Sequence, residues 1–339
     1  MKKIIEALDG KPAPVPPVWL MRQAGRYLPE YRALRSEAGS FWKMALTPRY
    51  AAEATLQPIK RFGFDAAILF SDILVVPEAL GCKVTFTEGE GPSLKPVSDV
   101  SGFEMDREKW SAYFSPVYEA LQLVRSGLDD DTALLGFAGA PWTLATYLAA
   151  GRGGDEQRAA KLWGYRDPQG FGQLLDVLAE CVAFHLIRQI EAGAEAVQIF
   201  DSWASGLPPT AFENWVIAPT RKIVGLVRAA HPGARIIGFP RAATLQGYER
   251  YAQATGVNAV SLDTAAPMDW AATTLAKNAT LQGNLDPLAL IAGFDALGQS
   301  VDAILDAMRG VPFIFNLGHG ILPETPIAHV EQLLKRIRG

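Results

Sequence analysis

The sequence predicts an α/β fold of the (β/α)₈ TIM barrel type, in which parallel strands alternate with helices around a closed ring. Short apolar segments, each ending in polar or glycine-rich sequence, recur along the whole chain. Between them lie longer segments with apolar residues three and four positions apart, and several begin near a proline, as helices often do. Barrels of about this length commonly form one domain, so we expect residues 1–339 to be a single domain.

Eight short apolar segments are predicted to be strands. They are residues 18–20, 65–70, 133–138, 195–200, 235–239, 258–262, 279–282 and 312–315. The helices expected after them are residues 49–62, 108–126, 168–192, 209–230, 243–255, 267–277, 287–309 and 325–338. A doubly wound open sheet would show the same alternation. No GxGxxG or Walker-type GxxxxGK motif follows any of these strands, which disfavours the nucleotide-binding version of that alternative.

Two segments depart from the alternation. Residues 83–97 alternate apolar and polar residues around Gly89-Glu90-Gly91-Pro92, which predicts a short β-hairpin inserted after the second strand. Residues 150–155 (AGRGGD) form a glycine-rich loop after the third strand. Two interpretations of this loop stay open, a lid over a ligand and a passive connector.

Composition argues against several classes of partner. The net charge is −4, from 32 basic and 36 acidic residues, and no polybasic run occurs, which argues against nucleic acid or an anionic membrane surface. No run of about 20 apolar residues is present to span a bilayer, and the N-terminal segment lacks the apolar core of a secretory signal. We therefore expect a cytoplasmic protein that attracts any anionic ligand through a local cluster of arginines.

Polar residues follow each predicted strand, where a barrel builds its active site. They are Arg22 and Arg26, Ser71 and Asp72, Thr143 and Tyr147, Asp201 and Ser202, Arg241, Asp263, Asn284, and the segment Asn316-Leu317-Gly318-His319-Gly320. Because the strands of a barrel are parallel, we expect these side chains to meet at one mouth.

The arginine pair is the most suggestive part of this set. Arg22 and Arg26 are four residues apart, so they would share a face in a helical turn, and Gly25 between them allows a ligand to approach the backbone. Two guanidinium groups so placed form a forked receptor for carboxylate or phosphate oxygens. The alternative is that they are solvated charges that cap a helix or pair with Glu30 and Glu37.

Three other candidates also have structural alternatives. Asp72 is a residue type that commonly caps a helix N-terminus. Tyr147 would also fit an interface between barrel and helix, with its hydroxyl in water. Ser202 lies outside any GxSxG motif, so a loop hydrogen bond is the alternative to a nucleophilic role.

The histidines and cysteines do not predict a metal site. His319 lies between two glycines, which leaves its imidazole open to a ligand, whereas His185 and His329 are interpreted as structural. The four histidines are far apart with no HxxxH motif, and Cys82 and Cys181 have no CxxC spacing. We therefore expect no bound metal and no disulfide.

Five segments resemble one family closely. PVWLMRQAGRYLPEY (17–31) and GFAGAPWTLATY (136–147) are similar to the two signature stretches of the uroporphyrinogen decarboxylase family. FSDILVVP (70–77), LQGNLDP (281–287) and NLGHG (316–320) also resemble that family. The order and spacing hold over essentially the whole chain, and strings of this length are far more specific than a single short motif.

The resemblance implies a single-domain (β/α)₈ barrel that pairs as a homodimer with its two clefts adjacent. It implies a lyase without a cofactor, which removes CO₂ from the four acetate side chains of uroporphyrinogen III to give coproporphyrinogen III. The family's substrate-binding positions map onto Arg22, Gln23, Ala24, Gly25, Arg26, Asp72, Tyr147, Ser202 and His319. It assigns no role to Asp201 or Trp203, because the residues around Ser202 differ among family members.

The chemistry of that substrate fits these residues. Arginines at the rim would bind carboxylates, and Asp72 would accept the pyrrole N–H groups at the centre of the ring. Protonating a pyrrole carbon makes a cationic ring that can accept the electron pair of the breaking bond, and Asp72 would stabilise that cation. The expected catalytic residues are Asp72, Arg22 and Tyr147. The proton donor stays open between Arg22, Tyr147 and an ordered water.

Two rival functions remain. Corrinoid-dependent or thiol methyltransferases share this barrel, but they need a thiolate-rich zinc site that the sequence lacks. A non-catalytic tetrapyrrole carrier would use the same pocket, and the sequence does not separate it from an enzyme.

Overall fold

The computed structural model describes residues 2–87 and 91–339. Seven parallel strands form one sheet in the order β1-β4-β5-β6-β7-β8-β9. Their bounds are β1 (Ala66–Ile68), β4 (Ala133–Gly139), β5 (Ala196–Asp201), β6 (Ile236–Pro240), β7 (Ala259–Ser261), β8 (Thr280–Leu285) and β9 (Phe313–Leu317). Seven of the eight predicted strands are thus observed within a few residues of their expected ends.

The remaining predicted strand closes the ring. Val18 forms a parallel bridge with Phe315 of β9, and the Phe315 N–H donates to the Pro17 carbonyl at 2.8 Å. On its other side, the Val18 carbonyl accepts from the Asp65 N–H at 2.9 Å, just before β1. The segment after Pro17 therefore joins β9 to β1 as a first strand reduced to one bridge, and the predicted (β/α)₈ barrel is confirmed.

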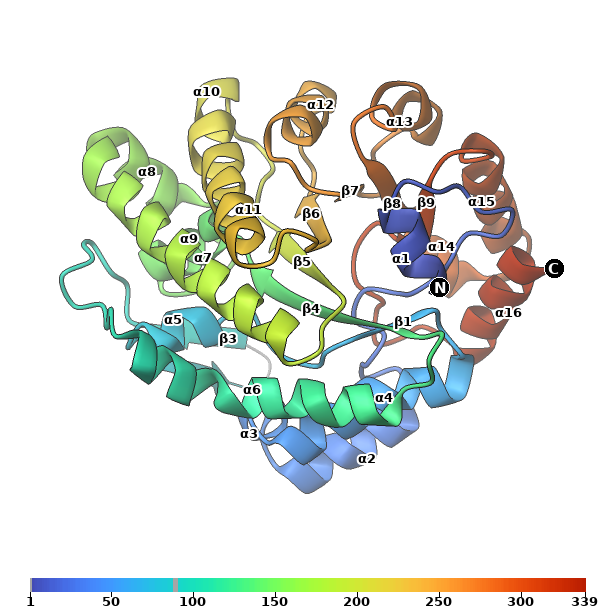
Figure 1. Cartoon of the computed structure of the whole chain (residues 1–339), viewed down its shortest axis with the longest axis horizontal. Helices are drawn as coiled ribbons and strands as arrows, with labels where there is room; N and C mark the ends of the chain where they lie inside the picture. The colour runs from blue at the N-terminus through green and yellow to red at the C-terminus, as the bar shows by residue number, and fades with distance from the viewer. Residues whose placement is uncertain (1, 88–90) are drawn as a thin grey trace.

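Helices surround this ring, as Figure 1 shows. They are α1 (Lys3–Leu8), α2 (Pro29–Ala38), α3 (Phe41–Ala45), α4 (Pro48–Phe62), α5 (Val75–Ala79), α6 (Arg107–Gly127), α7 (Pro141–Ala150), α8 (Arg158–Arg166), α9 (Pro168–Glu191), α10 (Pro209–Phe212), α11 (Ala218–Ala230), α12 (Leu245–Ala254), α13 (Met268–Thr274), α14 (Pro287–Ala292), α15 (Phe294–Ala307) and α16 (Ile327–Arg338). A π-helical turn, η1 (Glu213–Ile217), connects α10 to α11.

The expected helix at 287–309 is interrupted. It ends at Ala292, and a second helix begins at Phe294. Gly293 between them has φ 69°, a backbone conformation that side chains disfavour, and a Cβ there would lie 2.4 Å from the His329 ring. The close approach of α16 therefore forces the break, and the prediction of one continuous helix was wrong.

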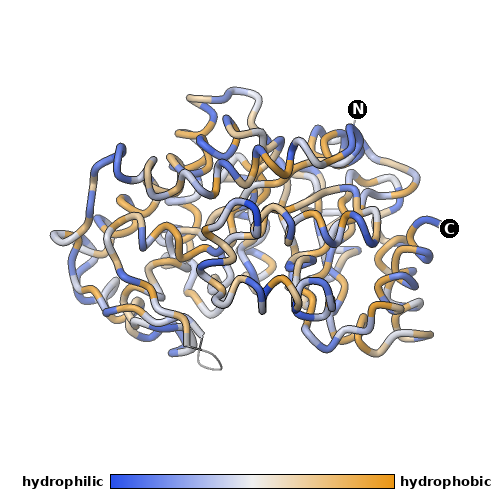
Figure 2. Tube along the Cα trace, turned by 90° about the horizontal axis from the view of Figure 1, so that it is seen from below, coloured by the Kyte–Doolittle hydropathy of each residue, from blue (hydrophilic) through white to orange (hydrophobic). Residues whose placement is uncertain are grey.

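The strands alternate between two apolar cores. Leu134, for example, packs with the outer helices, while Leu135 faces the inside of the barrel. Helix α1 contributes Ile4 and Leu8 to the inner core, so it closes the end of the barrel where the strands begin. Figure 2 shows hydrophobic and hydrophilic residues alternating along the outer helices, as amphipathic covering helices require.

The predicted hairpin is present after the second strand of the barrel. β2 (Val84–Thr87) and β3 (Gly91–Leu94) are antiparallel, and residues 88–90 of the expected turn lie outside the described residues. The glycine-rich loop at 150–155 is attached to this hairpin, because the Leu94 N–H donates to the Gly151 carbonyl at 2.8 Å and Ser93 bridges Arg152.

Helix α9 is long and apolar enough to cross a membrane by composition alone. Its apolar residues Leu174, Leu178, Val182 and Leu186 are fully buried in the protein. A core helix that covers a barrel strand passes the same test, and α9 packs against β4 and α11 in this way.

Candidate active site

Arg22 enters the mouth directly after the first strand. Its backbone has φ 61°, an unusual conformation for a residue with a side chain. A Cβ on Gly320 would lie 2.4 Å from the Arg22 Cδ. Because Gly320 has no side chain, Arg22 can pass across the loop that carries His319. This close approach explains why the NLGHG segment has a glycine at position 320.

Neither arginine of the predicted pair contacts an acid. Glu30 pairs instead with Arg61 at 2.7 Å, and Glu37 pairs with Arg49 at 3.0 Å, so the ion-pair alternative was wrong. Within residues 2–87 and 91–339, no carboxylate oxygen lies within 4.0 Å of the guanidinium nitrogens of Arg22 or Arg26. The shared helical face is also not observed, because residues 21–27 form turns and the helix begins only at Pro29.

The residues between the two arginines have different roles. The Gln23 side chain is fully buried, where its Oε1 accepts from the Leu20 N–H at 3.1 Å and its Nε2 donates to the Ala66 carbonyl at 3.0 Å. Gln23 therefore holds the first strand against β1. The N–H groups of Ala24 and Gly25 donate to no acceptor in the described part of the chain, so they remain available to an anion.

Asp72 follows β1 and carries a carboxylate with no basic partner within 4.0 Å among the described residues. Its Oδ1 accepts from the Leu74 N–H at 2.8 Å. Helix α5 begins at Val75 with no side-chain cap, so Asp72 is not the helix cap considered above. Burial raises the pKa of Asp72, while the Leu74 N–H and the charge of Arg22 oppose that rise.

Tyr147, on α7, lies in the same electrostatic environment. Burial raises the pKa of its hydroxyl, the charge of Asp72 raises it further, and the charge of Arg22 lowers it. Its ring meets the Trp203 ring edge-on, with centroids 6.5 Å apart. The charges of Asp72 and Arg22 both act on the Tyr147 hydroxyl, so these three predicted residues lie in one electrostatic environment.

A buried hydroxyl–carboxyl pair supports the loop that carries Ser202. Thr143 donates to Oδ1 of Asp201 at 2.5 Å and accepts from the Trp203 N–H at 3.2 Å. Asp201 is 1% exposed, and its Oδ2 has no partner among the described residues. Burial raises the pKa of Asp201 to about 7. The sequence predicted Asp201 at the end of a strand, but it did not predict Thr143 as its hydrogen-bond partner.

His319 is half-buried and neutral at pH 7. Burial lowers its pKa to about 4, and the positive charges of Arg241 and Arg22 act in the same direction. A neutral imidazole both donates and accepts a hydrogen bond, so His319 can orient a polar ligand atom without adding charge to the mouth.

Aromatic rings lie beneath this charged rim. Phe137 and Phe200 meet edge-on with centroids 5.5 Å apart, and Phe200 meets Phe239 at 6.1 Å. Phe137 and Phe200 pack on the inner core and remain partly exposed. Sequence reasoning missed this apolar floor, although a phenylalanine near the end of each of three neighbouring strands was the available signal.

The metal-binding residue types do not gather anywhere in the part of the chain that the structure describes. Across the described ranges, no group of three His, Cys, Asp or Glu side chains is placed to hold a metal ion. Both cysteines are free. His185 is buried against Phe114, and His329 contacts the Leu290 carbonyl at 3.0 Å.

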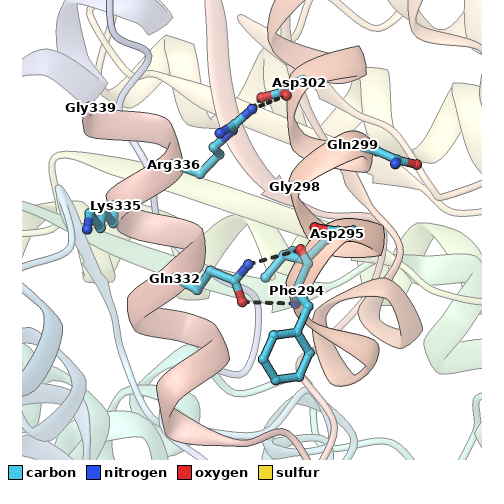
Figure 3. Close-up of a pocket in the computed structure, with 10 residues that line it drawn as sticks. Phe294, Asp295, Gly298, Gln299, Asp302, Gln332, Lys335, Arg336 and Gly339 are labelled. Atoms are coloured by element: carbon cyan, nitrogen blue, oxygen red, sulfur yellow. Dashed lines mark hydrogen bonds and ion pairs between the residues drawn. The ribbon is translucent and has the colours of Figure 1, made fainter.

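A groove of about 670 Å³ lies between α15 and α16, away from the barrel mouth (Figure 3). Two of its polar side chains are already paired with other residues of the groove. Gln332 makes two 3.0 Å hydrogen bonds to the backbone of Phe294, and Arg336 forms a bidentate pair with Asp302. A ligand there would have to displace these bonds, so the mouth remains the candidate site.

The fold and the mouth together are those of a barrel enzyme whose mouth carries guanidinium groups without an acid partner among the described residues. The family model for "Uroporphyrinogen decarboxylase (URO-D)" matches residues 1–339. The uroporphyrinogen decarboxylase of Chelativorans sp. strain BNC1 is 52% identical over 339 residues, which cover 99% of this chain and 98% of the relative. That of Rhizorhabdus wittichii is 52% identical over 338 residues, covering 100% and 98%. The chain therefore belongs to the uroporphyrinogen decarboxylase family.

Solved structures share the fold. A methyltransferase from Methanosarcina mazei superposes with a TM-score of 0.82 at 21% identity, over 99% of this chain and 97% of the other. A B12-independent methionine synthase from Shewanella sp. W3-18-1 gives 0.58 at 10% identity, over 96% and 98%. At such low identity these similarities concern the fold alone.

Proposed function

We propose that this chain, a uroporphyrinogen decarboxylase of haem biosynthesis, removes the four acetate carboxyl groups of uroporphyrinogen III to give coproporphyrinogen III. In this proposal residues 1–339 act as one catalytic domain. The observation that carries the site assignment is that Arg22, Asp72 and Tyr147 follow neighbouring strands of the ring, where the charge of Arg22 acts on both the Asp72 carboxyl and the Tyr147 hydroxyl.

The proposed binding of the substrate follows from the unpaired positive charges of Arg22 and Arg26. The substrate carries eight carboxylates around a ring, and Arg22 and Arg26 have no protein carboxylate to compete for them within the described chain. The free N–H groups of Ala24 and Gly25 add donors beside these guanidiniums. Ser202 and His319 supply neutral polar contacts, and Phe137 and Phe200 supply an apolar surface for the pyrroles.

The catalytic half depends on Asp72. A half-buried carboxylate with one hydrogen-bond donor still has acceptor capacity, and the pyrrole N–H groups would fill it. These donors favour the ionised form, so substrate binding offsets the burial that raises the pKa of Asp72. The fixed anion then lies where positive charge develops in the ring, which stabilises the transition state more than the ground state.

Each decarboxylation balances within the substrate and one proton. A proton adds to the pyrrole carbon next to the one that bears the acetate, and the ring becomes cationic. The bond to the carboxylate carbon breaks, CO₂ leaves, and the electron pair neutralises the ring. A proton then adds to the exocyclic methylene to form the methyl group, and the ring proton is lost.

Arg22 and Tyr147 are the proton-bearing groups beside Asp72. The pKa of Tyr147 is raised by burial, so its hydroxyl keeps its proton at neutral pH. The pKa of a guanidinium exceeds about 12, which makes Arg22 a poor acid. We assign to these two residues the role of holding and orienting the proton donor. The donor is one of the two side chains or an ordered water that they bind.

The assembly and location are part of the proposal. Family membership supports a homodimer, and two free cysteines fit the reducing cytoplasm. Sedimentation of the purified chain at micromolar concentration should give twice the mass of one chain. A monomer that is fully active at assay concentration would contradict the dimer and leave the chemistry intact.

The test of activity is an anaerobic assay that follows coproporphyrinogen formed from uroporphyrinogen III. We expect the heptacarboxylate, hexacarboxylate and pentacarboxylate intermediates to appear in turn, with one CO₂ released at each step. A protein that binds the substrate and releases no CO₂ would instead be a tetrapyrrole carrier.

A further inference from the structure

Arg241 is a third guanidinium at the mouth to which family resemblance gave no role. It follows β6, where its N–H donates to the Asp201 carbonyl at 3.1 Å and to the Phe239 carbonyl at 3.0 Å. The next residue, Ala242, has φ 56°, a backbone conformation that is unusual for a residue with a side chain. The side chain is half-buried, and its Nη1 donates to the Ser202 carbonyl at 3.4 Å.

The charge of Arg241 is not neutralised by a close acid. In the described part of the chain, no carboxylate oxygen lies within 4.0 Å of its nitrogens. Asp263 follows the neighbouring strand β7, but its Oδ1 accepts from the Ala265 N–H at 2.9 Å. A half-buried guanidinium without an acid is costly unless a ligand supplies one.

The topology places Arg241 across the mouth from the arginine pair. Around the ring, the first strand is followed by β1, β4, β5 and β6, so β6 is the fifth of eight strands and lies opposite the first. The Arg22 side chain passes beside Gly320, the residue after His319, and the charges of Arg241 and Arg22 both lower the pKa of His319. A ring with carboxylates on every side needs basic receptors on more than one wall.

We propose that Arg241 is a substrate-binding residue that holds a non-reacting carboxylate of the macrocycle, on the wall opposite Arg22 and Arg26. This inference rests on the proposed function and extends it. The Ser202 carbonyl orients the guanidinium, and the remaining N–H donors face the ligand. Because the contact is equal in ground state and transition state, it contributes to binding and little to the chemical step.

The experiment compares Arg241→Gln and Arg241→Lys with wild type in the anaerobic assay. For Arg241→Gln we expect KM for uroporphyrinogen III to rise roughly 10-fold or more, with kcat within about threefold of wild type. The KM of Arg241→Lys should lie between those of wild type and Arg241→Gln, because lysine keeps the positive charge but cannot bind a carboxylate through two parallel hydrogen bonds. The matched control is Arg309→Gln, which removes an exposed arginine at the opposite end of the barrel and should leave KM unchanged.

A second measurement separates this inference from the proposed function. In an Asp72→Asn background, where turnover should be blocked, the Kd of uroporphyrinogen III is measured anaerobically with and without Arg241→Gln. A rise of roughly 10-fold supports the inference whether or not the wild type shows turnover. An unchanged Kd, a fall in kcat at constant KM, or an equal effect of Arg309→Gln would overturn it.

Discussion

Charged side chains form ion pairs at one end of the barrel and lack close partners at the other. At the end where the strands begin, Glu195 accepts from Lys2 at 2.6 Å and from Arg125 at 2.9 Å, and Arg235 pairs with Asp9 at 2.8 Å. At the mouth, the three arginines and Asp72 have no ion-pair partner within 4.0 Å in the described ranges. The difference indicates that the closed end is organised for stability and the open end for a ligand.

The apolar groups show the same contrast. Helix α1 closes the lower end with Ile4, Ile5 and Leu8, which are nearly or fully buried. At the mouth, Phe137 and Phe200 remain partly exposed on the inner core. If this comparison is right, changing the unpaired charges at the mouth should alter catalysis and leave stability intact, and changing the paired charges at the closed end should do the reverse.

The largest effect is expected from Asp72→Asn at the mouth. The side chain keeps its shape and can still accept from the Leu74 N–H, but the charge that stabilises the cationic ring is lost. We expect kcat to fall about 100-fold or more, with the thermal midpoint close to that of wild type. Asp306→Asn, on the exposed opposite end, is the matched control and should keep full activity. Near wild-type turnover in Asp72→Asn would remove Asp72 from the centre of the mechanism.

The complementary change is Glu195→Gln at the closed end. It removes the negative charge between Lys2 and Arg125, although Glu195 is 30% exposed and solvent screens part of the loss. We expect the free energy of unfolding to fall by about 1–2 kcal/mol in urea titrations, with kcat unchanged. Glu37→Gln, which breaks a more exposed pair with Arg49, should have a smaller effect on the free energy of unfolding than Glu195→Gln. A loss of activity without a loss of stability in Glu195→Gln would break the comparison.

Arg26→Ala should affect binding more than chemistry. Its guanidinium is exposed and has no acid within 4.0 Å among the described residues, so it is free to bind a carboxylate. We expect KM for uroporphyrinogen III to rise about 5- to 10-fold and kcat to change less. Steady-state kinetics under anaerobic conditions measure both. A larger effect on kcat than on KM would assign Arg26 to the chemical step.

Asp201→Asn should change how stability depends on pH. The pKa of Asp201 is about 7 in the folded protein and 3.8 in an exposed carboxyl, so the folded state holds the proton more tightly. The stability from this group is fully present below pH 4 and is lost as the pH rises to about 7. Relative to wild type, the variant should therefore gain roughly 1 kcal/mol or more between pH 4 and pH 8. Parallel pH–stability curves for the two proteins would contradict the buried, protonated state.

The sequence predicted the barrel well because each strand is a short apolar run, and parallel strands place their polar ends at one mouth. The helices that it did not predict are α1, α2, α3, α5, α7 and α8, and two of them show why. Helix α1 has only six residues, and α7 is buried on nearly all sides, so neither shows a clear amphipathic period.

At the site, Asp72 was a candidate from its position a few residues beyond β1, whereas Tyr147 lies on α7 and its expected role came from the family resemblance. The pairing of Thr143 with Asp201 joins residues 58 apart in the sequence, and no local pattern reveals such a contact. The same holds for Gln23, whose side chain proves to hold two strands together. Arg241 was visible as a strand-end residue, but only the ring order places it opposite Arg22.

The most direct test of the central claim is a crystal structure of the protein with coproporphyrinogen III, grown anaerobically. The account predicts that the Asp72 carboxylate lies within hydrogen-bond distance of the pyrrole nitrogens, with propionates on the arginines of the rim. A ring bound with Asp72 turned away from those nitrogens, or bound outside the barrel mouth, would contradict it.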